Sequence, residues 1–342
     1  ARAAAVVARG WRLMVRLGES PSPLLATLRL LVPALTAERY KGQAGKIAVI
    51  GGCADYTGAP YYAAISALKL GADLSHVFCS DAAATAIKSY SPELIVHGCL
   101  KEGQPEARDA QVQAVCKWFP AITALVVGPG LGRDETLQAV AEGIIERAIA
   151  ESIPCVIDAD GLAVVVRKPA LVHGSKWTVL TPNRPEYQRL SQAVIPQATA
   201  AEPGQQAEAE HLAQLCTALG GPTVVRKGGV DLLSDGECWL GMAEAGSLKR
   251  SGGQGDVLAG SIATLLSWAR QAEVQAEATD ACAGGEGRPS APLLAAYTGC
   301  LLTRRFSAAA FARRRRAMTA PDLIEAIGPA FAEFEDGTGW AR

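Results

Sequence analysis

The stretch SGGQGD at residues 251–256, followed by the apolar run VLAGSIATLLSW at 257–268, predicts a glycine-rich loop that opens a helix. Glycine lacks a Cβ atom, so the three glycines allow backbone amides to approach a ligand closely. A helix N-terminus adds unpaired N–H donors and the positive end of a dipole, and the loop therefore predicts a site for a phosphate-sized anion.

Asp256 is the unusual residue of this loop, because a carboxylate repels phosphate. A carboxylate is expected at such a position when it must take a proton from a hydroxyl that attacks a phosphate. The alternative is structural: Asp256 caps the helix and the glycines form a tight turn. The loop alone leaves both interpretations open.

The rest of the chain predicts an α/β fold with a mainly parallel sheet and helices on both of its faces. Apolar runs of strand length alternate with segments of helical period, as expected when both sheet faces are covered. The expected strands are 46–50, 73–79, 94–97, 122–127, 154–157, 177–180 and 223–225, and the expected helices are 59–70, 106–119, 135–150 and 205–219. Segments 230–233 and 238–240, joined across 234–236, predict a late hairpin.

Composition excludes several classes of function. The 342 residues carry 33 basic and 34 acidic side chains, so charge indicates neither a nucleic-acid partner nor a membrane surface. The nine cysteines form no CxxC pair, which favours reduced thiols. The four histidines show no metal-ligand spacing, and no apolar run is long enough to span a membrane.

Glycine, proline and acidic residues follow directly after several expected strands. These turns are 51–52, 128–130, 158–161, 181–183 and 227–229. In open α/β sheets the ligand crevice lies outside the carboxyl ends of the strands, so the five turns together predict a nucleotide-sized cleft. Each turn also has a structural interpretation: Asp134 can cap a helix, Asn183 and Glu186 can form a capping box, and Lys227 can be a surface residue.

The order of the motifs resembles the ATP- or ADP-dependent NAD(P)H-hydrate dehydratase family, within the ribokinase-like superfamily. The motifs are GG at 51–52, YTGAP at 56–60, KSYSPE at 88–93, GPGLGRD at 128–134, DADGL at 158–162, NRPEYQRL at 183–190, KG at 227–228 and GGQGD at 252–256. The resemblance covers roughly residues 35 to 330. The glycine–aspartate loop alone would indicate only the superfamily, whose other members include sugar, pyridoxal and thiazole kinases.

The resemblance implies a ribokinase-like fold and assigns the site residues. Asp256 would be catalytic and would face the reactive hydroxyl of the substrate. The other residues expected to bind the hydrated dinucleotide are Gly132, Asn183, Arg184, Pro185, Glu186, Tyr187, Gln188 and Arg189. Those expected to line the nucleotide are Lys227, Gly228, Gly229, Val230, Asp231, Gly246, Ser247, Leu248, Lys249, Arg250, Ser251, Gly252, Gly253, Gln254 and Gly255.

The activity that the resemblance implies is ATP-dependent dehydration of (6S)-NADHX and (6S)-NADPHX to NADH and NADPH, with ADP and phosphate as products. Mg²⁺ would accompany ATP, with its protein ligands unassigned. Pairing with an NAD(P)HX epimerase and a homo-oligomeric state would also fit. Two alternatives are a small-molecule kinase of the superfamily and a non-catalytic dinucleotide-binding relative. Segments 56–60 and 183–190 argue against the first, and the presence of Asp256 argues against the second.

The domain organisation expected from the sequence is a basic segment at 1–34, a single catalytic domain at 35–333 and a C-terminal tail at 334–342. Residues 271–290 lack periodicity and predict a flexible surface insertion. Residues 1–18 contain four arginines and no acidic residue, as in transit peptides, which indicates a mitochondrial or plastid location. A basic surface helix on a cytoplasmic protein is the alternative.

Overall fold

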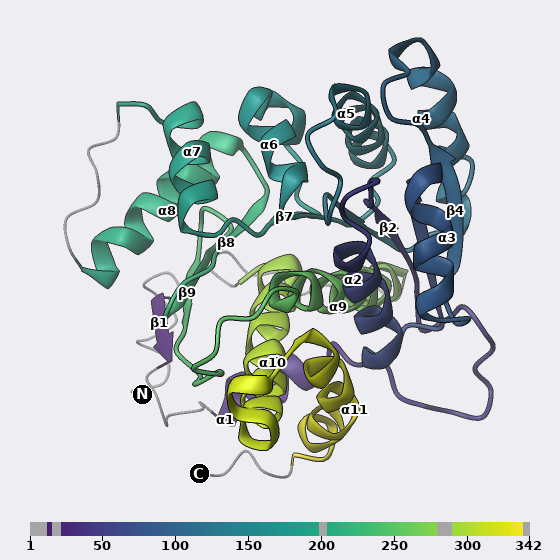
Figure 1. Ribbon diagram of the computed structural model, residues 1–342. Helices are drawn as coiled ribbons and strands as arrows, with labels where there is room; N and C mark the ends of the chain where they lie inside the picture. Colours follow the sequence, from purple (N-terminus) through teal and green to yellow (C-terminus); the bar gives the residue numbers. More distant parts are fainter. Residues whose placement is uncertain (1–11, 16–21, 198–203, 279–288, 338–342) are drawn as a thin grey trace.

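The computed structural model describes residues 12–15, 22–197, 204–278 and 289–337, and a ten-stranded sheet forms its centre (Figure 1). The strands are β1 (Arg12–Val15), β2 (Lys46–Ile50), β3 (Leu74–Ser80), β4 (Ile95–Leu100), β5 (Ala124–Val127), β6 (Cys155–Ile157), β7 (Thr178–Leu180), β8 (Thr223–Arg226), β9 (Asp231–Ser234) and β10 (Trp239–Met242). Their order is β1-β10-β9-β8-β7-β6-β5-β2-β3-β4. Only β9 runs against its neighbours in this sheet, so the mainly parallel sheet and the late hairpin are both confirmed.

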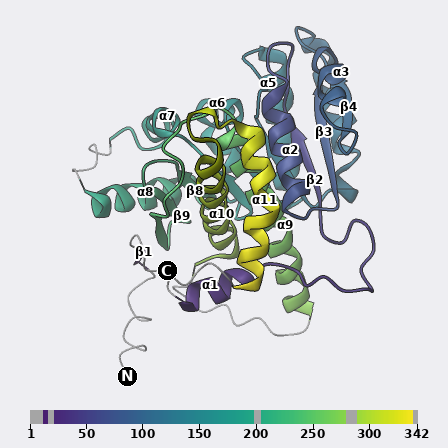
Figure 2. The same ribbon diagram turned by 60° about the horizontal axis from the view of Figure 1, so that its bottom comes forward.

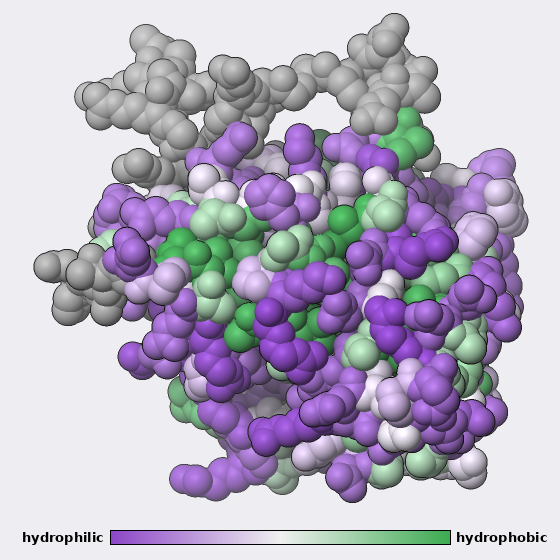
Figure 3. Space-filling view, turned by 90° about the horizontal axis from the view of Figure 1, so that it is seen from above, coloured by the Kyte–Doolittle hydropathy of each residue, from purple (hydrophilic) through white to green (hydrophobic). Residues whose placement is uncertain are grey.

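Helices cover both faces of the sheet, as predicted (Figures 1 and 2). On one face lie α1 (Ser22–Arg29), α2 (Gly58–Leu70), α3 (Asp81–Tyr90), α9 (Gln254–Ala278), α10 (Ala291–Arg314) and α11 (Ala320–Asp336). On the other lie α4 (Arg108–Cys116), α5 (Glu135–Ala150), α6 (Asp160–Arg167), α7 (Arg184–Val194) and α8 (Gln205–Leu219). Hydrophilic side chains predominate on the outer surface of this second layer, with apolar patches between them (Figure 3).

The burial of both sheet faces explains why the strand sequences are apolar without alternation. In β2, Ile47 and Val49 enter the core under α2 and α9, while Ala48 and Ile50 enter the core under α5. All four side chains are fully buried. A strand that is covered on both sides has no water-facing positions for polar residues. None of the described helices is both long enough and apolar enough to cross a membrane.

The chain reverses its direction of travel across the sheet between β2 and β5, and this reversal places the crevice. From β2 it moves outward to β3 and β4, then returns to add β5 on the other side of β2. The loops after the two strands touch, since the amide of Gly52 donates a 3.1 Å hydrogen bond to the carbonyl of Gly130. A Cβ on Gly51 would lie 2.1 Å from the carbonyl oxygen of Pro129, so this close approach requires glycine. Such a switch point is where α/β sheets bind ligands.

The two ends of the domain pack together, although the sequence assigned them to segments outside it. Leu28 of α1 is fully buried in the core that α10 and α11 share. Figure 2 shows α1 next to one end of α11. Arg29 donates a 2.7 Å hydrogen bond from Nε to the carbonyl of Phe334, and its guanidinium lies over the Phe334 ring. The packed domain therefore includes α1 and extends to the end of α11. Of residues 1–18, only β1 is described, in parallel pairing with β10, so the targeting prediction concerns residues that mostly lie outside the described ones.

The expected insertion at 271–290 begins as regular helix. Residues 271–278 continue α9, which the lack of apolar periodicity did not predict. Residues 279–288 lie outside the described part of the chain. The expected helix at 106–119 is also shorter, since α4 ends at Cys116 and a 3₁₀ turn at Phe119–Ala121 contains Pro120.

Candidate functional site

The glycine loop forms the start of α9, as the sequence predicted. Gly253 precedes the helix with a φ of +87°, and a Cβ there would lie 2.6 Å from Cβ of Ala320 and 2.9 Å from Cδ2 of Tyr62. The loop is thus wedged between α11 and α2. Gly255 faces the other way: a Cβ would lie 3.5 Å from Nζ of Lys227 and 3.6 Å from Oδ2 of Asp158. A glycine is therefore required at 253 by the backbone conformation and the close neighbours. At 255 the absence of a side chain leaves space next to charged groups.

Three loops at the carboxyl end of the sheet meet in a charged cluster in front of α9. Lys227, after β8, donates a 2.8 Å hydrogen bond from Nζ to Oδ1 of Asp158, after β6. Thr181, after β7, donates to the same oxygen over 2.8 Å. The side chain of Asp158 is only 3% exposed and that of Lys227 is 22% exposed. The predicted convergence of these turns on one edge of the sheet is therefore present.

Asp256 lies in the first turn of α9 beside this cluster. Burial raises the pKa of its carboxyl to about 7, with repulsion from Asp158 and Asp160 adding to the effect and Lys227 opposing it. No hydrogen bond joins the Asp256 carboxylate to another described residue, so the capping role considered from the sequence is not observed. A carboxylate with a pKa near neutrality and a free lone pair suits proton abstraction.

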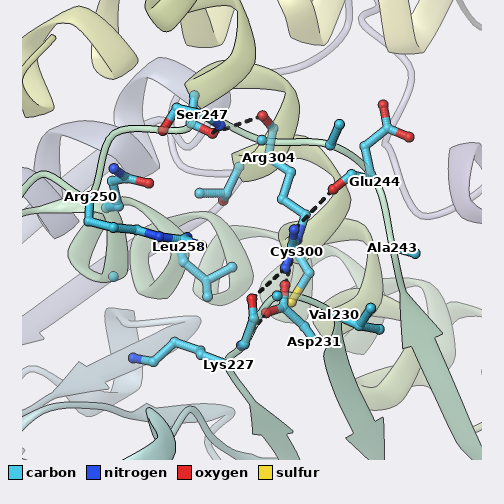
Figure 4. Close-up of a pocket in the computed structure, with 18 of the residues that line it drawn as sticks. Lys227, Val230, Asp231, Ala243, Glu244, Ser247, Arg250, Leu258, Cys300 and Arg304 are labelled. Atoms are coloured by element: carbon cyan, nitrogen blue, oxygen red, sulfur yellow. Dashed lines mark hydrogen bonds and ion pairs between the residues drawn. The ribbon is translucent and has the colours of Figure 1, made fainter. Parts of the chain in front are cut away.

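A cavity of about 640 Å³ opens beside Lys227 and the start of α9 (Figure 4). Most of the predicted nucleotide-binding residues line it, namely Lys227, Gly228, Gly229, Val230, Asp231, Gly246, Ser247, Leu248, Arg250, Gln254 and Gly255. Lys249 instead donates from Nζ to the carbonyl of Arg316. Ser251 accepts a 3.0 Å hydrogen bond from Nε2 of Gln254. Gly252 and Gly253 belong to the loop itself and do not line the cavity.

Arg304, on α10, is the main residue of this cavity that sequence reasoning missed. It donates from Nε to Oδ2 of Asp231 over 2.7 Å, from Nη1 to the carbonyl of Glu244 over 3.0 Å, and from Nη2 to the carbonyl of Gly228 over 3.0 Å (Figure 4). Asp231 also accepts a 2.8 Å hydrogen bond from the amide of Gly228. Asp231 therefore shapes the loop rather than presenting a free carboxylate.

The other lining residues missed by the sequence come from the loop after β10 and from α9 and α10. They are Ala243, Glu244, Ala245, Leu258, Cys300, Thr303 and Ser307. Among the residues that sequence reasoning missed, only Arg304 carries a signal in the sequence. It follows an apolar run within a helix, and a charge in such a position is costly unless it has a partner.

The start of α7 carries a capping box and, within it, the Glu186 carboxylate, which lies in the electrostatic surroundings of Lys227. The Asn183–Glu186 capping box is complete, since the Glu186 amide donates to Oδ1 of Asn183 over 3.0 Å and the Asn183 amide donates to Oε2 of Glu186 over 2.8 Å. Burial raises the pKa of Glu186, while the amide of Asn183 and the charge of Lys227 act in the opposite direction. Glu186 thus belongs to the electrostatic surroundings of Lys227.

The rest of the predicted dinucleotide segment divides between solvent and core. Arg184, Pro185, Gln188 and Arg189 are exposed. Tyr187 is buried, and its hydroxyl lies 2.8 Å from Nδ1 of His211 on α8. The structure therefore turns Tyr187 into the core, away from the cleft where the resemblance had placed it.

Gly132 lies at the same edge of the sheet and is fixed by an acidic residue from the DADG motif. Its amide donates a 2.9 Å hydrogen bond to Oδ2 of Asp160, and its φ is +79°. Burial raises the pKa of Asp160, and the Gly132 amide opposes this effect. Because Asp160 also acts on the pKa of Asp256, it links the Gly132 loop to the catalytic candidate. The motif had been noted in the sequence, but Asp160 had not been chosen as a site residue.

The NAD(P)H-hydrate dehydratase family model matches residues 47–329 of the chain. This span includes the glycine loop, the charged cluster and the cavity. The chain belongs to the NAD(P)H-hydrate dehydratase family. Among similar members of this family, a Bos taurus protein named ATP-dependent (S)-NAD(P)H-hydrate dehydratase is 49% identical over 308 residues, covering 90% of this chain and 88% of the bovine one. The Vitis vinifera protein of the same name is 47% identical, covering 88% of this chain and 84% of its own.

Solved structures confirm the ribokinase-like fold. A ribokinase-like superfamily protein from Enterococcus faecalis matches with a TM-score of 0.66 and 19% identity, over 95% of this chain and 97% of that one. The ADP/ATP-dependent NAD(P)H-hydrate dehydratase from Bacillus subtilis, co-crystallised with ATP and Mg²⁺, matches with a TM-score of 0.63 and 20% identity, over 91% and 97%.

Proposed function

We propose that this chain is an ATP-dependent (S)-NAD(P)H-hydrate dehydratase, which returns (6S)-NADHX and (6S)-NADPHX to NADH and NADPH and releases ADP and phosphate. The observation that carries the proposal is the position of Asp256. This carboxylate has no hydrogen-bond partner among the described residues and a pKa of about 7, and it stands at a helix N-terminus beside a nucleotide-sized cavity. The names of relatives that are about half identical over most of the chain support the same activity.

The chemistry follows from the leaving group. Hydroxide leaves a carbon atom poorly, whereas phosphate leaves well. Asp256 takes the proton of the C6 hydroxyl while the hydroxyl oxygen bonds to the γ-phosphorus of ATP and the bond to ADP breaks. The lone pair of the ring nitrogen then expels phosphate from C6, and loss of a proton from C5 restores the dihydropyridine.

The first turn of α9 and Lys227 supply the electrostatic part. Amides at the start of a helix have no acceptor within the helix, so those of Gly255 and Asp256 can donate to the transferred phosphoryl group. Gly255 presents no side chain toward Lys227, which leaves room for that group. The hydrogen bond to Asp158 fixes the position of the Lys227 ammonium before the substrate binds.

Mg²⁺ is part of this proposal. Within the described residues no group of three or more His, Cys, Asp or Glu side chains could hold a metal ion. Mg²⁺ in phosphoryl-transfer sites is commonly held by one or two carboxylates together with the phosphates of the substrate. The carboxylates of Asp158 and Asp160, which both act on the pKa of Asp256, fit such partial ligation. When bound, the ion would neutralise phosphate charge.

The proposal is tested by incubating the protein with hydrated NADH and either ATP or ADP, and following the recovery of dihydropyridine absorbance. We expect recovery with ATP, one phosphate released per NADH formed, and recovery slowed by about 10²–10⁴-fold in the Asp256→Asn variant. Recovery should stop at the fraction of S epimer and resume when an NAD(P)HX epimerase is added. Accumulation of a phosphorylated product without NADH would instead show a kinase, and binding without turnover would show a non-catalytic relative.

A further inference from the structure

A second cavity, of about 550 Å³, lies at the end of the sheet opposite Asp256. Lys46, the first residue of β2, and Thr123, immediately before β5, both line it. It therefore lies at the amino ends of the two strands whose carboxyl ends lead into the Gly52 and Gly130 loops. Its volume is within the range of small-molecule sites. The full lining is Thr36, Glu38, Arg39, Tyr40, Lys41, Gly42, Gln43, Lys46, Thr123 and Gln271.

The floor of this cavity is a hydrogen-bonded chain of polar groups from β2, the β5 loop and α9. The amide of Lys46 donates to Oγ1 of Thr123 over 2.9 Å. Ser267 of α9 donates to the same oxygen over 2.7 Å, and Nε2 of Gln271 donates to Oγ of Ser267 over 3.3 Å. These bonds order the lining groups before any ligand binds, which reduces the entropic cost of binding.

The wall of the cavity is the connection between α1 and β2, and it is fixed in place. The amides of Gly42 and Ala44 donate to Oδ2 of Asp73 over 2.7 and 2.8 Å. Nε1 of Trp268 donates to the carbonyl of Ala44 over 2.7 Å. In Figures 1 and 2 this connection runs along the outside of the domain before it enters β2. The cavity is thus built by an anchored segment.

The charge of the lining is predominantly positive. Arg39, Lys41 and Lys46 face one acidic residue, Glu38, and none of the three cations forms a salt bridge within the described residues. Nη1 of Arg39 is buried and has no hydrogen-bond partner. An anionic oxygen is the acceptor that a guanidinium or ammonium group facing a cavity binds best.

Tyr40 adds an aromatic group to these cations. Its side chain lines the cavity and is 71% exposed, so its ring is open to a ligand. A planar ring system stacked on an exposed tyrosine removes apolar surface of both from water. Cations and an exposed aromatic ring in one cavity together match a ligand that carries phosphates and a nucleobase.

We propose that this second cavity binds a nucleotide, with its phosphates held by Arg39, Lys41 and Lys46 and its base stacked on Tyr40. The site is separate from the nucleotide cavity beside Asp256, and it does not depend on the activity proposed above. Arg39 supplies a forked donor to the phosphate oxygens, and the two lysines supply point charges.

The proposal is tested by equilibrium dialysis with the non-hydrolysable ATP analogue AMP-PNP, counting the molecules bound per chain. We expect two in the wild type and one in an Arg39→Ala, Lys41→Ala double variant, which should keep its dehydratase activity and melting temperature. Gly255→Val, which places a side chain beside Lys227, should also leave one, and combining it with the double variant should leave none. Losing one charge-assisted phosphate contact weakens binding by roughly 10-fold or more.

The matched control is Lys101→Ala, which removes a cation that follows β4, at the opposite end of the sheet from the cavity, and should keep two molecules per chain. Lys41→Glu provides a second route to the same loss if the Arg39 variant folds poorly. Tyr40→Ala in the Gly255→Val background should weaken the remaining AMP-PNP site. One AMP-PNP per wild-type chain, or two in the Arg39→Ala, Lys41→Ala variant, would overturn the proposal.

Discussion

Nζ of Lys227 lies 2.8 Å from Oδ1 of Asp158, and this contact joins the loop after β8 to the loop after β6. Both charges act on Asp256: Asp158 raises the pKa of its carboxyl, and Lys227 lowers it. Burial has the largest effect and leaves the pKa of Asp256 at about 7. The ion pair thus fixes one negative and one positive charge beside Asp256, and these charges shift the pKa of its carboxyl in opposite directions. With burial added, the carboxyl ionises near neutral pH.

Replacing Asp256 by Asn should lower turnover by about 10²–10⁴-fold, the loss typical of a missing general base. Nucleotide binding should survive, because a negative charge close to phosphate is removed. The measurement is steady-state turnover of hydrated NADH together with the Kd for AMP-PNP. Glu135→Gln is a matched control, because Glu135 is also an acidic residue in the first turn of a helix and is exposed. An Asp256→Asn enzyme with near wild-type turnover would show that another group takes the proton.

The pH dependence should report the same group. Because the base must be ionised, kcat/KM should fall tenfold per pH unit below a pH of about 7. In Asp158→Asn the repulsion is lost while Lys227 remains, so the midpoint should move to lower pH. A profile whose acid limb lies near pH 4 in the wild type would contradict the pKa assigned to Asp256.

The pH dependence of the melting temperature should report the same ionisation of Asp256. The pKa of Asp256 is raised on folding, from 3.8 to about 7. The contribution of this group to stability is therefore fully present below pH 4 and is lost as pH rises toward 7. An Asn at this position cannot ionise, so Asp256→Asn should melt at a higher temperature than the wild type, with a difference that grows from pH 4 to pH 7. Equal melting temperatures across this range would indicate that Asp256 is well solvated.

Two glycines of the loop should respond differently to the same substitution. Gly253→Val combines a φ of +87° with a Cβ 2.6 Å from Ala320, so it should lower both the melting temperature and the activity. At Gly255 the nearest atoms to a Cβ are at 3.5 and 3.6 Å, in ordinary contact distance, so Gly255→Val should keep the fold but fill the space of the phosphoryl group. Thermal melting and turnover, measured on both variants, separate the two cases. Similar losses of stability in both would assign Gly255 a structural role as well.

The sequence predicted the parts of the site that follow strands, because each of them is marked by a short segment of neighbouring residues. Lys227, Asp256 and the turns around them occur in glycine-rich segments at strand ends, and parallel strands bring such segments to one edge. Arg304 could not be placed, because its partner Asp231 lies 73 residues away and only packing of α10 against β9 brings the two together.

The sequence contains the reason why Tyr187, which we expected among the dinucleotide-binding residues, is buried. Tyr187, Leu190 and Val194 follow the spacing of one helical face, and Tyr187 and Leu190 are buried in the core next to α8. Because of the motif around Asn183 and Glu186, all seven residues from 183 to 189 were assigned to the site, although a helix can present only one of its faces to a cleft. The capping box itself was predicted correctly as one of two interpretations.

Leu28 offers a test of whether α1 belongs to the domain. It is fully buried in a core shared with Phe334, whereas Leu30, one residue beyond the helix, is 81% exposed. Leu28→Ala removes buried methyl groups and leaves a cavity, which should lower the free energy of unfolding by about 2–5 kcal/mol. Leu30→Ala makes the same chemical change at the surface and should alter it by less than about 0.5 kcal/mol. Denaturant melts of both variants give the comparison, and turnover well below the melting temperature should be unchanged in each, because α1 contributes nothing to the cavity beside Asp256. If Leu28→Ala behaved like Leu30→Ala, α1 would be dispensable for stability and the boundary near residue 34 would stand. A large loss would instead show that the catalytic domain begins before α1, with the helix closing the core around the end of α11.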